Sequence, residues 1–148
     1  MSTIEKAIEI AAREHAGDID KGGNPYIFHP LRLMFAVKKP FEKMAAVLHD
    51  VVEDTPVTLD DLRDEGFHPE VIAAIEALTK KPGESRMEAA TRAAANPIAI
   101  VVKLADVTDN MDLSRISDPT EKDFARLKEY FAVKKYLVEQ ITAQNKSS

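Results

Sequence analysis

The sequence predicts an all-α protein, and three observations carry this prediction. Apolar residues recur at intervals of three and four along most of the chain, which is the spacing of one helix face. Prolines and glycines stand between these periodic segments, where helices begin and end. No segment keeps the apolar and polar alternation of a half-buried strand. The β-branched run at 98–102 could form a buried strand, but its Asn-Pro start and its continuation through Lys103–Asp106 favour a helix.

Three helices are expected in the first part of the chain. Ser2 or Thr3 can cap the first helix, because a short hydroxyl side chain accepts a hydrogen bond from the first turn. Pro30 suits the first turn of the second helix, and Pro40 marks the break before the third. The expected spans are Ser2 or Thr3 to near Gly17, Pro30 to about Val37, and Phe41 to Glu53, with a turn-rich loop over Gly17–Pro25.

Five more helices are expected after the third. Thr58 starts a cap pattern, while Pro69 and Pro97 each open a helix. The last helix places large apolar residues at broadly helical spacing. The expected spans are Thr58 to near Gly66, Glu70 to Thr79, Arg86 to Ala95, Ile98 to Met111, and Glu121 to Gln144, which carries the apolar residues Phe124, Leu127, Phe131, Tyr136, Leu137 and Ile141.

The bulk composition narrows the class of protein. At 148 residues and 45% hydrophobic content, the whole chain, residues 1–148, is expected to be one domain with its own core. The net charge of −5 argues against broad binding to nucleic acid or to anionic membranes, but allows a local site for a small anion. No cysteine is present, which excludes disulfides and thiolate metal sites. No apolar stretch is long enough to span a bilayer and no signal sequence precedes the first helix, so a cytoplasmic location is expected.

Four ionisable residues interrupt the apolar third helix: His49, Asp50, Glu53 and Asp54. In a continuous helix, spacings of three and four would place the imidazole and the carboxylates on one face. Unpaired carboxylates cost several kcal/mol when they are buried among apolar neighbours. The cluster therefore requires a compensating cation, which is either a metal ion or basic side chains that form salt bridges.

Four residues on separate parts of the chain are candidates for one metal site: His29, His49, Asp50 and Asp106. Two imidazoles and two carboxylates suit borderline-to-hard divalent ions and leave coordination positions for water and substrate. Mn²⁺ fits this set best, with Fe²⁺, Zn²⁺ or Mg²⁺ as alternatives. Taken singly, His29 could instead cap a helix, and Asp106 could be an ion-paired residue on a buried helix.

The order of these residues resembles the H…HD…D signature of HD-domain metal-dependent phosphohydrolases. Three segments narrow the resemblance to the hydrolase domain of Rel/SpoT proteins and to small, free-standing alarmone hydrolases of the metazoan SpoT homologue type. These segments are Gly23–Pro30 (GNPYIFHP), Ala46–Thr55 (AVLHDVVEDT), and Val102–Asp106 (VKLAD) followed by Asp109–Met111. The similarity runs from about residue 4 to 140.

This resemblance implies a single HD-domain helical bundle that binds one Mn²⁺ and removes the 3′-pyrophosphate of (p)ppGpp. It implies that His29, His49, Asp50 and Asp106 are the metal ligands. Glu53 and Asp54 match the pair that positions or deprotonates the attacking water, while Lys21 and Asn110 match positions that contact the nucleotide. A divalent ion that acidifies water, together with a carboxylate that orients it, accounts for such a hydrolysis without a covalent intermediate.

Two positions depart from the family pattern. Asp20 stands where a basic residue usually precedes Lys21, and Val107 follows the last expected ligand where long Rel/SpoT proteins commonly carry arginine. Because Asp20 removes a cation near the nucleotide, an HD phosphohydrolase for another phosphorylated nucleotide stays open as an alternative. A catalytically silent nucleotide sensor is a third hypothesis, against which the presence of all six candidate metal and water-handling residues argues. The aromatic residues of the last helix also leave a homo-oligomer open.

Overall fold

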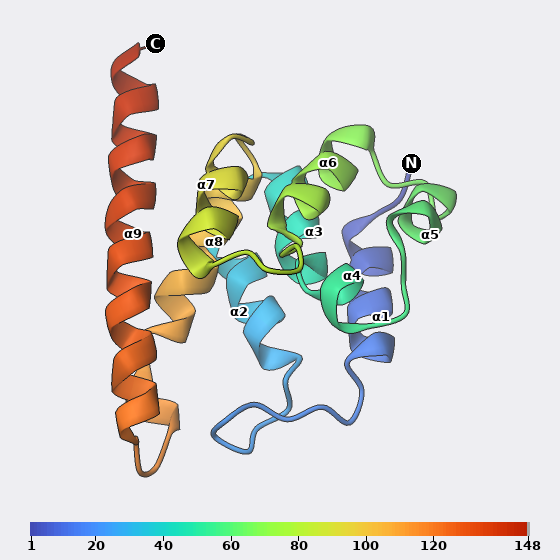
Figure 1. The fold of residues 1–148 in the computed structure, drawn as a ribbon. Coiled ribbons are helices and arrows are strands. Elements are labelled where there is room, and N and C mark those ends of the chain that lie inside the picture. Colours follow the sequence, from blue (N-terminus) through green and yellow to red (C-terminus); the bar gives the residue numbers. More distant parts are fainter. Residues whose placement is uncertain (148) are drawn as a thin grey trace.

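The computed structural model describes residues 1–147, and these residues form an all-helical bundle without a β-strand (Figure 1). An isolated bridge between Ile19 and Pro25 closes the turn-rich loop after the first helix. The predicted fold class is therefore confirmed. The elements are α1 (Ile4–Glu14), α2 (Phe28–Ala36), α3 (Pro40–Leu48), α4 (Val51–Asp54), α5 (Leu59–Asp64), α6 (Pro69–Leu78), α7 (Arg86–Ala94), α8 (Ala99–Asn110), the short 3₁₀ helix η1 (Leu113–Arg115) and α9 (Glu121–Ser147).

Side-chain caps fix the start of several predicted helices. Thr3 accepts a hydrogen bond from the backbone N–H of Lys6 at the start of α1. Thr58 and Asp61 form a reciprocal capping box on α5, and Ser85 forms another with Glu88 on α7. Each cap satisfies backbone N–H groups that have no partner inside the helix.

Helix α3 lies at the centre of the bundle and packs against α1, α2, α6 and α8. Its apolar residues Ala45–Leu48 are fully buried, as are Val71 and Ile75 of α6 and Val102 of α8. Figure 1 shows α9 standing along one side of this body, where α7 and α8 contact it. A second, smaller cluster fills that interface and includes Val133 and Leu137 of α9.

The expectation of one unbroken helix from Phe41 to Glu53 is wrong. The chain turns at His49 and Asp50, so that α3 ends at Leu48 and α4 begins at Val51. The cause is local: the carbonyl oxygen of Ala46, which would accept the N–H of Asp50 in a regular helix, instead accepts bonds from the backbone N–H and the ring Nδ1 of His49. This turn places the carboxylate of Asp50 beside the ring of His49.

The large apolar residues of α9 differ in burial. Phe124 and Phe131 are 52% and 57% exposed, whereas Leu137 is fully buried. Helix α9 packs on the body mainly through α7 and α8, so one face of this long helix is covered. The two phenylalanines lie outside that face. No helix in the described part of the chain is long and apolar enough to cross a membrane.

Candidate active site

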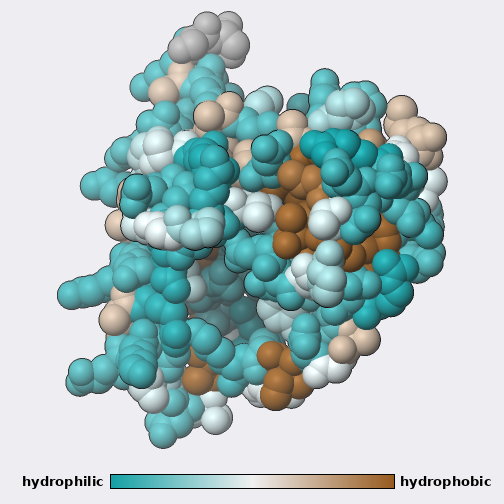
Figure 2. Space-filling model, turned by 45° about the vertical axis from the view of Figure 1, so that its right-hand side comes forward, coloured by the Kyte–Doolittle hydropathy of each residue, from teal (hydrophilic) through white to brown (hydrophobic). Residues whose placement is uncertain are grey.

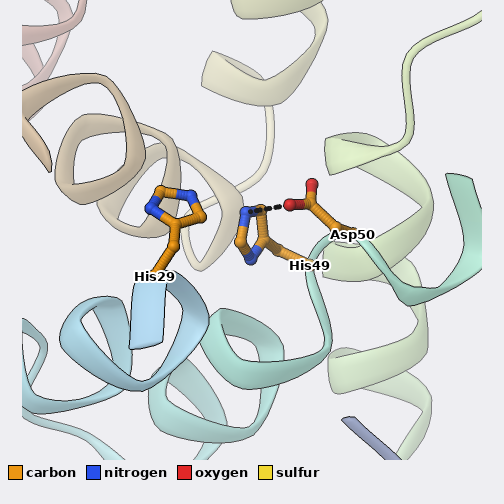
Figure 3. A group of neighbouring side chains, drawn as sticks. All are labelled: His29, His49 and Asp50. Atoms are coloured by element: carbon orange, nitrogen blue, oxygen red, sulfur yellow. Dashed lines mark ion pairs between the residues drawn. The ribbon is translucent and has the colours of Figure 1, made fainter. Parts of the chain in front are cut away.

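Helix ends bring the first three candidate ligands together. His29 lies in the first turn of α2, while His49 and Asp50 form the turn between α3 and α4 (Figure 3). Each of the three offers a ligand atom within 4.8 Å of the other two. Asp106 of α8 joins them, since its Oδ1 lies 2.9 Å from Nε2 of His29 and 3.7 Å from Nε2 of His49. All four predicted metal ligands therefore converge.

The ring of His49 indicates that this cluster needs a cation. Its Nδ1 lies 2.7 Å from the carbonyl oxygen of Ala46, so Nδ1 carries the proton and donates to that oxygen. Its buried Nε2 has no hydrogen-bond partner among the described residues, yet it lies 3.0 Å from Oδ2 of Asp50. A neutral ring would direct a lone pair at a carboxylate. Either a proton on Nε2, which the raised pKa of His49 favours, or a bound metal ion offsets this repulsion.

The pKa values of His49 and Asp106 also indicate that the cluster favours positive charge beside its carboxylates. Burial alone lowers the pKa of His49, but the charge of Asp50 and the contacts with Asp106 raise that pKa well above its usual value. Burial raises the pKa of Asp106, and the two imidazoles outweigh this effect and bring it well below the usual range. The site therefore favours ionised carboxylates and positive charge beside them.

A carboxylate that the sequence analysis did not single out holds His29 in place. Oδ2 of Asp109 lies 2.6 Å from Nδ1 of His29, which leaves Nε2 directed at Asp106. Arg32 donates two hydrogen bonds to Asp109, at 2.8 and 2.9 Å, and Arg115 donates to its backbone oxygen. Such carboxylate–histidine pairs orient metal-binding imidazoles. The position of Asp109, three residues after Asp106 on one helix, is a signal that could have revealed it.

Tyr26 is a second residue that the sequence analysis missed. Its hydroxyl donates a hydrogen bond to Oδ2 of Asp50. Burial and the nearby charge of Asp50 raise the pKa of Tyr26, so the phenol stays protonated and remains a donor. Behind it, the buried ring of His15 packs edge-on at 5.0 Å. Tyr26 thus fixes the carboxylate of one expected ligand.

Glu53 and Asp54 form an acidic group with Asp50, in which the three carboxylates lie within 4.8 Å of one another. Oε1 of Glu53 accepts a hydrogen bond of 2.7 Å from the backbone N–H of Lys80. Burial, and then the charges of Asp50 and Glu53, raise the pKa of Asp54 to about 6. A carboxyl that titrates near neutrality can accept a proton from water.

Two adjoining cavities open onto this cluster. The first, of about 360 Å³, is lined by the cluster itself and by the cations Lys80, Arg86 and Lys103. The second, of about 340 Å³, is lined by the loop at Asp20–Gly22 and by Arg126. Tyr26, His29, Asn110 and Tyr130 line both cavities. Figure 2 shows that the molecule is hollowed between α9 and the body on a largely hydrophilic face.

The two expected nucleotide contacts lie at these cavities. Lys21 lines the second cavity and has no ion-pair partner among residues 1–147, and burial lowers its pKa. Asn110 lines both cavities and donates a 3.1 Å hydrogen bond to Oδ1 of Asp106. Asp20 stands where the family usually carries a basic residue. Its Oδ1 accepts hydrogen bonds from the backbone N–H groups of Gly22 and Asn24, so Asp20 stabilises the turn of this loop.

Comparison with known proteins identifies relatives. No protein-family model matches the chain. The chain is 33% identical over 146 residues to a probable GTP pyrophosphokinase of Mycobacterium leprae, covering 90% of this chain and 18% of that protein. It is 33% identical over 126 residues to a guanosine-3′,5′-bis(diphosphate) 3′-pyrophosphohydrolase of Spiroplasma citri, covering 75% of this chain and 17% of that protein. The chain thus spans under a fifth of the length of these curated relatives.

A solved structure supplies the corresponding fold. It is described as a metazoan orthologue of SpoT that hydrolyses ppGpp and plays a role in starvation responses. The TM-score is 0.76 at 26% identity, and the match covers 95% of this chain and 85% of the other. The similarity in length and helical arrangement extends over nearly the whole bundle.

Proposed function

We propose that this chain, which belongs to the SpoT-related family of HD-type hydrolase domains, removes the 3′-pyrophosphate of (p)ppGpp. The observation that carries the proposal is the meeting of His29, His49, Asp50 and Asp106 beside a pair of further carboxylates. Related proteins named as ppGpp 3′-pyrophosphohydrolases, and a related structure whose description reports ppGpp hydrolysis, support it.

The ligand set supports one divalent ion, and we propose Mn²⁺. Two imidazole nitrogens and two carboxylates favour a borderline-to-hard cation over a soft one, with Fe²⁺, Zn²⁺ or Mg²⁺ as alternatives. When bound, such an ion acidifies water and neutralises phosphate charge. His29 and His49 would each offer Nε2, because their Nδ1 atoms are engaged by Asp109 and the Ala46 carbonyl.

The remaining side chains have separate tasks in this proposal. Glu53 and Asp54 orient the attacking water and accept its proton. Lys80, Arg86 and Lys103 line the same cavity and offset the charge of the pyrophosphate group. Lys21 and Asn110 contact the nucleotide in the adjoining cavity. Together the two cavities fall within the ~300–1,000 Å³ typical of small-molecule sites.

The test is product analysis after incubation of purified protein with ppGpp and Mn²⁺. Chromatography should detect GDP and pyrophosphate with the wild type, and both products should form about 10²- to 10⁴-fold more slowly with Glu53→Gln. Asp60→Asn, which changes an exposed carboxylate of α5 that lines neither cavity, serves as the matched control and should retain the wild-type rate. Intact ppGpp after incubation with the metal-loaded wild type would reject the proposal.

A second candidate function rests on Asp20. The carboxylate at this position supplies no positive charge beside Lys21, so another phosphorylated nucleotide could be preferred. A screen of guanine and adenine nucleotides with Mn²⁺ separates the two candidates. Turnover of another nucleotide with ppGpp left intact supports the second one, and nucleotide binding without any turnover supports a silent sensor.

A further inference from the structure

The loop between α6 and α7, residues 79–85, forms part of the wall of the metal cavity. Lys80 lines that cavity, and the backbone N–H of Lys80 donates to Oε1 of Glu53 at 2.7 Å. This bond fixes one oxygen of the carboxylate that is proposed to handle the attacking water. The orientation of Glu53 therefore depends on the position of a loop 27 residues further along the chain.

That loop is itself held by a single arginine outside the cavity lining. Arg92 of α7 donates from Nη2 to the carbonyl oxygen of Thr79 at 2.6 Å. Its Nε and Nη2 also donate to the two carboxylate oxygens of Glu84, each at 2.8 Å. One guanidinium thus binds the loop at its first residue and near its end. Because the planar guanidinium forms two parallel hydrogen bonds with the carboxylate, it fixes the orientation of Glu84 as well as its distance from Arg92.

Glu84 connects this contact to the loop backbone. Its Oε1 accepts the N–H of Lys81 at 2.6 Å while it receives Arg92, and its side chain is only 14% exposed. Two successive backbone N–H groups are consequently held by two carboxylates: that of Lys80 by Glu53, and that of Lys81 by Glu84. Movement of the loop would break the bond of Lys80 to Glu53 and the bonds of Glu84 to Arg92.

We propose that Arg92 is a positioning residue for hydrolysis, which sets the carboxylate of Glu53 through Glu84 and the backbone of Lys80. The inference rests on the proposed function. Arg92 acts without touching the substrate, because it lies behind the loop, where it also approaches the carbonyl groups at the end of α6. Small displacements of a group that orients a reactant reduce rates strongly.

The first test measures the loop without any substrate. Amide hydrogen exchange should show a protected Lys80 N–H in the wild type and exchange faster by about tenfold or more in Arg92→Ala, since the N–H opens when the loop is released. Arg92→Lys should give an intermediate exchange rate at Lys80, because lysine keeps the positive charge but cannot form the two parallel hydrogen bonds of the guanidinium with Glu84. Arg63→Ala, which removes an equally simple arginine–carboxylate pair on α5, is the matched control and should leave Lys80 unchanged.

The second test is kinetic. Arg92→Ala should lower kcat on ppGpp by about 10- to 100-fold, while Mn²⁺ affinity stays within a factor of about two, and Arg92→Lys should recover part of kcat. In a Glu53→Gln background, Arg92→Ala should lower kcat little further, because Arg92 is proposed to act only through the carboxylate of Glu53. Equal Lys80 exchange in wild type and Arg92→Ala, or an undiminished effect of Arg92→Ala without Glu53, would overturn the proposal. If the wild type leaves ppGpp intact, the proposed function fails and the exchange experiment alone decides whether Arg92 holds the loop.

Discussion

His29 and Asp109 form a buried pair in which Nδ1 of the ring lies 2.6 Å from Oδ2 of the carboxylate. Asp109 keeps its negative charge in this position: burial raises its pKa, but His29 and Arg32 bring it far below the usual value. The proton of His29 is thereby held on Nδ1, and Nε2 is left for a cation. The orientation of one expected metal ligand thus depends on a residue outside the expected ligand set.

Asp109→Asn should weaken metal binding without removing any ligand. The amide keeps the shape of the carboxylate but loses the charge that orients the imidazole and raises its basicity. The expected loss of Mn²⁺ affinity is about 10- to 100-fold, the usual effect of losing such a partner. Isothermal titration calorimetry measures it, with Asp60→Asn as the surface control. Unchanged affinity in Asp109→Asn would show that His29 is held by other contacts.

Asp54 should titrate near pH 6 in the metal-free protein. Burial and the adjacent carboxylates of Asp50 and Glu53 raise its pKa to about 6. Removing one of these charges in Asp50→Asn should lower the pKa of Asp54, and a bound divalent cation should lower it as well. Carboxyl carbon NMR across a pH series measures both effects. An ordinary value of about 4 for the wild-type side chain would contradict the described environment.

The ion pair between Glu84 and Arg92 should stabilise the fold in a defined pH range. The Arg92 hydrogen bonds lower the pKa of Glu84 to about 2, from an ordinary value of about 4.3. Because the folded-state pKa is depressed, the contribution is complete above about 4.3 and is lost as the pH falls toward 2. Thermal unfolding should therefore separate wild type from Glu84→Gln above pH 5 and bring them together near pH 2. A Tm difference that stays constant over this range would contradict the pairing.

Truncation of Leu137 and of Phe131 in α9 should lower stability by different amounts. Leu137 is fully buried against α7 and α8, so Leu137→Ala should cost about 2–5 kcal/mol of unfolding free energy. Phe131 is 57% exposed, and Phe131→Ala should cost only about 0.5 kcal/mol. Urea denaturation compares them directly. Equal losses would mean that α9 buries both faces.

Local sequence signals were sufficient for most of the helices and for the metal cluster. Prolines at 30, 69 and 97 and caps such as Thr58 act within one turn, so their effects can be predicted without tertiary structure. The four expected ligands were singled out because their order matches a known family, and the structure brings their side chains together. The turn at His49 was not predicted, because a ring nitrogen competing for the Ala46 carbonyl leaves no mark in a hydrophobic pattern.

The supporting contacts depend on residues far apart in the sequence. Tyr26 reaches Asp50, Arg32 reaches Asp109, and the Lys80 backbone reaches Glu53. Each pairing requires the bundle to be assembled before the partners meet. Exposure of Phe131 likewise depends on which face of α9 the body covers, and an apolar residue at helical spacing does not determine that face.

The most direct measurement of the central claim follows oxygen from solvent during ppGpp hydrolysis. The reaction is run with Mn²⁺ in water enriched in the heavy oxygen isotope, and mass spectrometry is applied to the separated products. Attack of water on the 3′-diphosphate predicts GDP without the label and pyrophosphate that carries it. Label in GDP, release of single phosphate groups, or intact ppGpp in the presence of the metal would contradict the account.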